Sequence, residues 1–174
     1  MITTKILSGT ILALLAFMYL PACNFVNNNH VKGSGHIIKE ERQIQPFQEL
    51  KIYGSMNVEL TQGATKAAVI EGDDNVIPLV ELKQEGNRLV VKMKEGYDLY
   101  NSSHLTVYLT TETIREATTA GSGDLKMSGK FNSSENVKFS LAGSGNFYGS
   151  INPPEVKASI AGSGNMDLTG ETRD

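Results

Sequence analysis

The feature that most constrains how this chain can fold is a six-residue segment that occurs three times in its second half. The segment reads Ala-Gly-Ser-Gly-Asp-Leu at 120–125, Ala-Gly-Ser-Gly-Asn-Phe at 142–147 and Ala-Gly-Ser-Gly-Asn-Met at 161–166. Successive copies start 22 and 19 residues apart. A repeat of about 20 residues with one turn per copy is typical of a β-solenoid, in which each coil packs against its neighbours.

The glycines of these copies predict sharp corners between short strands. Glycine adopts positive φ without the steric penalty of a Cβ atom, and the Asp or Asn that follows can bond to its own backbone. The pattern Val-Lys-x-Ser-x precedes the second and third corners, at 137–141 and 156–160. The predicted corner glycines are Gly121, Gly123, Gly143, Gly145, Gly162 and Gly164. The predicted inward side chains are Val137, Phe139, Leu141, Val156, Ala158, Ile160 and Leu168.

The first half of the chain alternates apolar and polar residues. A period of two predicts strands with one face in the core and the other in water. The alternating runs are 50–52, 58–60, 80–82, 89–94 and 105–110, with glycine-rich turns between them, and residues 53–58 look like a degenerate early copy of the repeat. The chain is therefore predicted to be all-β: a single-domain β-solenoid, similar to a parallel β-helix, built of short strands with Gly-Ser-Gly corners.

The first 22 residues are predicted to be a helical signal peptide of the lipoprotein type. A single cation, Lys5, precedes a mostly apolar run at 6–20 that is too short to span a membrane comfortably. The only cysteine, Cys23, follows Leu-Pro-Ala, and these four residues resemble a bacterial lipobox. We therefore expect cleavage before Cys23 and attachment of lipid to it, which would anchor the protein in a membrane.

Residues 23–46 are predicted to be a flexible tether, and residues 47–174 the β-solenoid domain. The tether is rich in Asn, Gly and Ser and shows no hydrophobic alternation. Lipoproteins that Bacteroidetes export to the cell surface often carry acidic residues just after the cysteine, and residues 24–28 contain none. We therefore expect an exported protein, anchored by lipid to the outer membrane and facing the periplasm rather than the cell surface.

Charge and histidine content argue against several partners and cofactors. The formal net charge is −3 and the cations are scattered, so the chain lacks the basic surface that binds nucleic acid. The corner acids do not recur every nine residues as in calcium-binding rolls, and no P-loop is present. After the tether, His104 is the only histidine. We therefore predict neither a metal site nor a cofactor.

Taken together, these motifs resemble a known family, the head GIN domain or putative autotransporter adhesin domain, which is common in Bacteroidetes lipoproteins. The resemblance covers residues 47–170 and rests on three features: Phe-Gln-Glu-Leu-Lys-Ile at 47–52, Val-Glu-Leu-Thr-Gln-Gly at 58–63 and the three glycine copies. It implies a β-helical solenoid without catalytic residues. Family members usually continue through more coils, so the resemblance also implies that a partner or the chain's own tail covers the last coil, or that this coil lacks a cap.

No catalytic residues are predicted from the sequence itself. The serines are not part of a Gly-x-Ser-x-Gly elbow between a strand and a helix. Three acids lie close together, Glu71, Asp73 and Asp74, but they fall in a turn rich in Gly and Asn. We interpret them as solvated acids rather than as a carboxylate pair that cleaves glycosides.

Exposed aromatic and polar side chains are the candidate binding residues. Tyr97 and Tyr100, in the loop 95–103, and Tyr148 could stack on sugars or anchor a partner, although single exposed aromatics are also common on sheets. Polar residues of the corners complete the predicted surface: Ser144, Asn146 and Asn165.

The sequence thus predicts a lipid-anchored cell-envelope protein with a non-catalytic structural or adhesive role, whose partner is a glycan or an envelope protein. The alternative is a carbohydrate-binding module of a glycan-handling system. A β-helical polysaccharide lyase or hydrolase is a weaker alternative.

Overall fold

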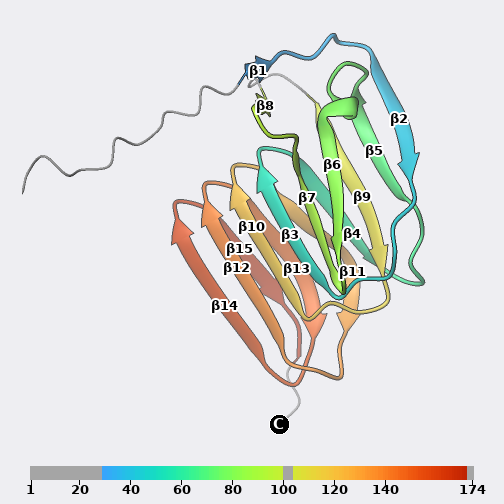
Figure 1. Ribbon diagram of the computed structural model, residues 1–174. Helices are drawn as coiled ribbons and strands as arrows, with labels where there is room; N and C mark the ends of the chain where they lie inside the picture. The colour runs from blue at the N-terminus through green and yellow to red at the C-terminus, as the bar shows by residue number, and fades with distance from the viewer. Residues whose placement is uncertain (1–28, 100–103, 172–174) are drawn as a thin grey trace, which may run out of the picture.

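The protein is built from two large β-sheets that face each other (Figure 1). Their inner side chains share one hydrophobic core. The computed structural model describes residues 29–99 and 104–171. The predicted signal peptide, Cys23 and Tyr100 lie outside these ranges. Within them the chain folds as all-β, as predicted, with a single 3-10 turn, η2 (Ile77–Leu79), as its helical element.

The first sheet has six strands. In spatial order these are β14 (Val156–Gly162), β12 (Val137–Gly143), β10 (Glu116–Gly121), β3 (Glu49–Gly54), β7 (Arg88–Met93) and β6 (Val80–Glu85). The second sheet has seven strands. Its order is β15 (Asn165–Thr169), β13 (Asn146–Asn152), β11 (Leu125–Asn132), β4 (Asn57–Gln62), β9 (Leu105–Thr111), β5 (Ala68–Asp73) and β2 (Ile37–Arg42). Two short strands, β1 (Asn29–Val31) and β8 (Tyr97–Leu99), pair with each other.

In the second half of the chain, each repeat contributes one strand to each sheet. A Gly-Ser-Gly corner joins β10 to β11, β12 to β13, and β14 to β15. Neighbouring repeats pair in parallel and in register, so that Gly121 pairs with Gly143 and Gly143 with Gly162. The degenerate copy joins β3 to β4 in the same way, and its Gly54 pairs with Gly121.

The first half of the chain departs from a simple coil. β5 pairs antiparallel with both β2 and β9, and β6 pairs antiparallel with β7. Both sheets are therefore mixed, and the prediction of a β-solenoid is not confirmed. One physical reason is the two-residue turn at 86–87, where Gly86 has φ 61° and reverses the chain into a hairpin.

The prediction that residues 23–46 form a flexible tether is wrong for much of 29–46, the part of this range that the structure describes. β2 lies inside it and pairs along its whole length with β5. The guanidinium group of Arg42 donates hydrogen bonds to the carbonyl oxygens of Ile77 and Val80, at 2.8 and 2.5 Å. β2 is an edge strand with four charged side chains, as edge strands commonly have. Because of these charges its sequence lacks the apolar alternation from which a strand is predicted.

The core joins the two sheets within each repeat. The rings of Phe139 on β12 and Phe147 on β13 are 4.7 Å apart at their centroids. Val137, Phe139 and Leu141 are buried as predicted. The predicted inward residues of the last repeat are less buried, and Ile160 is 50% exposed, because β14 and β15 are edge strands with a neighbour on one side only. The others are Val156 and Leu168, which are partly buried, and Ala158, which is exposed.

Candidate binding surfaces

The predicted corner glycines stack in a column along the molecule. The backbone amides of Ser144 and Gly145 donate hydrogen bonds to the carbonyl oxygen of Gly121, at 3.0 and 3.2 Å. Gly143 has φ 127°, and a Cβ atom on it would lie 2.2 Å from the same oxygen. The same pattern joins the first corner to Gly54 and the third corner to Gly143. These glycines therefore serve the stacking of the corners.

The second glycine of each copy does not have a positive φ, but the backbone of the preceding corner comes too close to it for any side chain. A Cβ atom on Gly123, Gly145 or Gly164 would lie between 1.8 and 2.1 Å from a backbone oxygen of the preceding corner. Any side chain at these positions would push the corners apart. All six predicted corner glycines thus have a structural explanation.

Asn146 and Asn165, two predicted binding residues, belong to a ladder of polar side chains beside the corners. The Oδ1 atom of Asp124 accepts hydrogen bonds from the backbone amide and the Nδ2 of Asn146, at 2.8 and 2.9 Å. Asn165 Nδ2 donates to Asn146 Oδ1 at 3.2 Å, and the Asp124 amide donates to Asn57 Oδ1 at 3.0 Å. These polar groups hold neighbouring repeats together. Ser144, the third predicted corner residue, is exposed beside them.

Tyr97 lines a shallow hollow at the head of the corner column. The hollow has a volume of about 460 Å³, and Tyr53 and Tyr97 in its wall are 41% and 39% exposed. Its other lining residues are Gly54, Lys92, Met93, Lys94, Glu95, Gly96 and Asp98. Tyr53 is not among the binding residues predicted from the sequence. The signal that could have identified it is an aromatic residue directly before the corner glycine of the early copy.

A strip of small side chains runs from Tyr53 along the outer face of the six-stranded sheet. Tyr53 pairs in register with Ala120, which is followed on the next strands by Ala142 and Ala161. The row beside it consists of Thr118, Ser140 and Ser159. Because these side chains are short, the strip is flat, and the two tyrosines stand at one end of it.

Tyr148 lies on a different surface, the outer face of the seven-stranded sheet. It is 41% exposed and pairs in register with Lys126 on one side and Asp167 on the other. The hollow around it has a volume of about 500 Å³ and also includes Lys130. The structure therefore does not bring Tyr97 and Tyr148 together, and the predicted binding residues belong to more than one surface.

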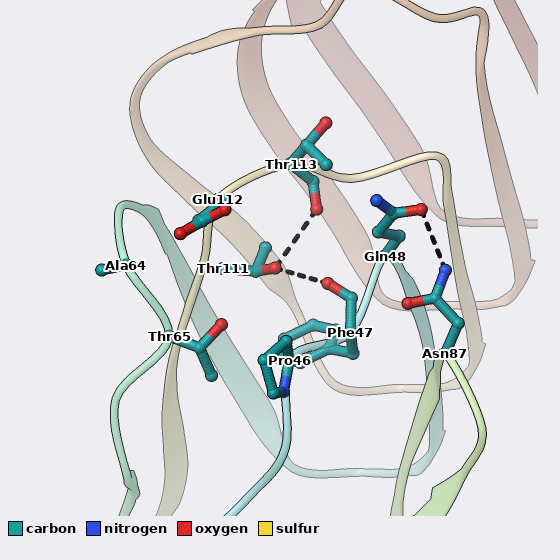
Figure 2. A pocket seen from close by; sticks show the side chains of 9 residues that line it. All are labelled: Pro46, Phe47, Gln48, Ala64, Thr65, Asn87, Thr111, Glu112 and Thr113. Carbon is teal, nitrogen blue, oxygen red and sulfur yellow. Dashed lines mark hydrogen bonds between the residues drawn. The ribbon is translucent and has the colours of Figure 1, made fainter.

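A third hollow, of about 320 Å³, is a structural junction (Figure 2). Thr111 in its floor is 1% exposed, and its hydroxyl group donates a hydrogen bond to the carbonyl oxygen of Phe47 at 2.5 Å. Asn87 Nδ2 donates to Gln48 Oε1 at 2.9 Å across the same hollow. The Thr111 bond joins the segment that enters β3 to the end of β9, and the Asn87 bond joins the same segment to the turn between β6 and β7.

The prediction that the three turn acids are solvated holds for Asp74, which is exposed, but not for Asp73. Asp73 is 3% exposed, so that interpretation is wrong for it. Its carboxylate accepts hydrogen bonds from the backbone amides of Gly35, at 2.6 Å, and His104, at 3.2 Å. Asp74 Oδ1 accepts one from the Ser34 hydroxyl at 2.6 Å. These two acids fasten the segment before β2 to the end of β5.

Glu71 is the centre of a polar cluster on the seven-stranded sheet. Its carboxylate lies 3.1 Å from Lys39 Nζ and accepts a hydrogen bond from the Tyr108 hydroxyl at 3.0 Å. The hydrogen bond with Lys39, more than the one with Tyr108, lowers the pKa of Glu71. Burial, followed by the hydrogen bond to Glu71, raises the pKa of Tyr108. An ionised carboxylate of low pKa is a weak base and a protonated tyrosine is none, so the cluster does not suit proton abstraction.

In residues 29–99 and 104–171, no group of three or more His, Cys, Asp or Glu side chains is placed to hold a metal ion. No helix in the described part of the chain has both the length and the apolar character needed to cross a membrane.

Comparison with known proteins places the fold in a family. Residues 46–174 match the family described as "Putative auto-transporter adhesin, head GIN domain". The chain belongs to this family. The resemblance of the sequence to the head GIN domain is thereby confirmed. A comparison with curated proteins gave no match.

Two solved structures share the fold of this head GIN domain. A crystal structure named "Putative lipid binding protein", from Parabacteroides distasonis, has a TM-score of 0.72 and 22% sequence identity, and the match covers 82% of this chain and 63% of that one. This chain therefore spans less than two thirds of that relative. A "putative adhesin" from Parabacteroides merdae has a TM-score of 0.52 and 18% identity, with 83% and 93% of the two chains covered. At these identities the likeness extends to the fold alone.

Proposed function

We propose that this head GIN domain is a non-catalytic adhesive module of the bacterial cell envelope. The observation that carries the proposal is the hollow with Tyr53 and Tyr97 at the end of a flat strip of small side chains. Exposed tyrosines provide a large contact area at low conformational cost, and a flat strip admits an extended partner. The repeats from β10 to β15 act in this proposal as a short β-solenoid that carries the strip. Membership of the adhesin family supports the same role.

A role without catalysis is supported by how the polar side chains are used. Asp124 and Asn146 bond to each other between repeats, and Asp73 bonds to backbone amides. The low pKa of Glu71, caused mainly by Lys39, makes its carboxylate a weak base. Among the described residues these groups therefore stabilise the fold instead of acting on a substrate.

Lipid on Cys23 anchors the module in this proposal. Cys23 is 6 residues before Asn29, where β1 begins, so the described part of the domain can begin at most about 20 Å from the lipid. This short reach suits a partner within the envelope, on the periplasmic side of the outer membrane. We expect Cys23→Ser to move the protein from the membrane fraction to the soluble fraction of cells. An unchanged membrane fraction would contradict the anchor.

Carbohydrate is the second candidate for the ligand class. It is favoured by two exposed tyrosines next to both cations and acids, because sugars stack on aromatic rings and bond to charged groups through their hydroxyls. The relative named as a lipid-binding protein suggests a different ligand, but the charged rim of this hollow, with Lys92, Lys94 and Asp98, fits a polar ligand better.

Retention on a glycan array and co-sedimentation with purified cell-wall sacculi test the surface. We expect the intact protein, in detergent, to bind, and Tyr53→Ala and Tyr97→Ala to weaken binding by about tenfold or more. Tyr148→Ala, on the other sheet, is the matched control and should bind normally. Loss of binding only in Tyr148→Ala would move the site to the other sheet. Retention on neither array nor sacculi would remove carbohydrate as the ligand.

A further inference from the structure

The two sheets end differently at the two ends of the molecule. At one end the edge strands are β14 and β15, which belong to the same repeat, and at the other they are β6 and β2 (Figure 1). An edge strand offers unpaired backbone amides and carbonyls to another chain, and proteins commonly protect such edges with charged side chains. Only one of these two ends is protected in this way.

The end formed by β6 and β2 carries many charges. Lys83 on β6 forms an ion pair with Glu85 at 2.8 Å, and Glu81 forms one with Lys92 at 3.3 Å. The charged residues of β2 are Lys39, Glu40, Glu41 and Arg42. Another strand that added to this end would have to displace or desolvate these charges.

The end formed by β14 and β15 carries one charge on each strand, Lys157 and Asp167. It also leaves the core partly open. Ile160 is 50% exposed, whereas Leu141, with which it pairs on β12, is 1% exposed. Met166 on β15 is partly buried against the core. The core therefore ends here in an apolar edge that charges hardly protect.

We propose that two copies of this chain associate through the β14–β15 end, about a twofold axis parallel to the strands. The corner between β14 and β15 reverses the chain, so these strands run in opposite directions on the two sheets. A half-turn about such an axis therefore lays β14 antiparallel beside β15 of the partner, and β15 beside β14 of the partner. The six-stranded sheet of each copy then continues into the seven-stranded sheet of the other.

Charge complementarity selects this arrangement. Lys157 and Thr169 lie on the parts of β14 and β15 that are farthest from the corner. In the antiparallel pair, Lys157 therefore lies opposite the partner's Thr169 and diagonal to the partner's Asp167, which has the opposite charge. A twofold axis perpendicular to the sheets would instead set Asp167 opposite the partner's Asp167, and like charges in that position repel.

The arrangement also covers the open core and closes the assembly. Ile160 comes to lie beside the partner's Met166, so apolar side chains that are exposed in one copy are buried in two. The charged β6 and β2 edges remain on the outside of both copies. A closed twofold pair is therefore expected to form without growing into larger assemblies.

Sedimentation equilibrium of the full chain, in a density-matched detergent, tests the association. We expect a dimer at micromolar concentration, and a monomer of unchanged circular dichroism for Ile160→Lys. Ile37→Lys is the matched control, because Ile37 is 45% exposed on β2 at the other end, and it should remain dimeric. A monomeric wild type, larger oligomers, or equal dissociation of the two variants would overturn the proposal.

A charge reversal tests the pairing of β14 with β15 of the partner. At each of the two symmetric contacts, Lys157→Glu sets an acid diagonal to the partner's Asp167, so the substitution should weaken the dimer by about tenfold. Adding Asp167→Lys to the same chain restores opposite charges and should restore the dimer. If the double variant stays as weak as Lys157→Glu, the proposed strand pairing is wrong.

Discussion

A Cβ atom on Gly143 would lie 2.2 Å from the carbonyl oxygen of Gly121, the residue with which Gly143 pairs on the neighbouring strand. The space between the two corners is thus filled by their own backbones. The oxygen of Gly121 also accepts hydrogen bonds from the amides of Ser144 and Gly145. Glycine is therefore needed at the corners for packing, whatever ligand the protein binds.

Gly143→Ala is expected to lower the free energy of unfolding by at least about 2 kcal/mol. The substitution strains a residue at φ 127° and also forces the new methyl group into a backbone oxygen. Gly86→Ala is the control, because Gly86 has φ 61° with nothing within 4 Å of the added atom, and it should cost about 1 kcal/mol. Urea unfolding measures both. Equal losses would mean that the corners are not in contact.

Leu141→Asp is expected to abolish stable folding, since it buries an unpaired carboxylate at a cost of several kcal/mol. Leu141 is 1% exposed in the core between the sheets. Ala142→Asp, one residue further along the same strand, places the same charge on the exposed face and should leave the melting temperature nearly unchanged. Thermal unfolding followed by circular dichroism compares the two variants. Normal stability of Leu141→Asp would show that its inward placement is wrong.

Asp73→Ala is expected to loosen the segment that leads into β2. The substitution removes the carboxylate that accepts hydrogen bonds from the Gly35 and His104 amides. Each hydrogen bond to a charged group contributes about 1.5–3 kcal/mol to stability. Asp74→Asn alters a more exposed carboxylate, 44% exposed, and should have the smaller effect. Limited proteolysis at residues 33–36 and urea unfolding report the change. Cleavage no faster than in the wild type would contradict this role of Asp73.

Acid is expected to destabilise the protein as the pH falls below about 5. The main cause that lowers the pKa of Glu71 below its ordinary value of 4.5 is the hydrogen bond from Lys39, and for Asp74, whose ordinary pKa is 3.8, it is the hydrogen bond from Ser34. A group with a depressed folded-state pKa stabilises the fold above its unfolded pKa and loses this effect as the pH falls through its folded pKa.

Urea unfolding across this pH range should therefore show a shallower decline for Glu71→Gln than for the wild type. Glu95→Gln, which removes an exposed carboxylate, is the control and should retain the wild-type slope. A decline in Glu71→Gln as steep as in the wild type would show that Glu71 does not contribute to it.

The second half of the fold could be predicted because its sequence repeats. Gly121 and Gly143 mark equivalent positions, so their spacing indicates which strands are neighbours. The first half has no such marker. Its pairing depends on contacts far apart in sequence, such as β2 with β5, and on the hairpin at Gly86, whose turn was identified but whose antiparallel consequence was not.

The candidate surfaces were only partly predictable. Tyr97 and Tyr148 are exposed as predicted, but alternation along a strand does not tell which of two sheets a side chain belongs to. Asn146 was selected as a free polar group, whereas stacking of the repeats gives it a partner in Asp124. Asp73 looked solvated because the residues that bury it are distant in sequence, at Gly35 and His104.

Hydrogen exchange at the backbone amide of Ser144 tests the stacked corners most directly. The side chain of Ser144 is exposed, but its amide donates to Gly121 in the repeat before it. We predict that this amide exchanges at least about a hundredfold more slowly than that of Lys66, an exposed loop residue. Exchange of Ser144 as fast as that of Lys66 would show that the corners do not stack.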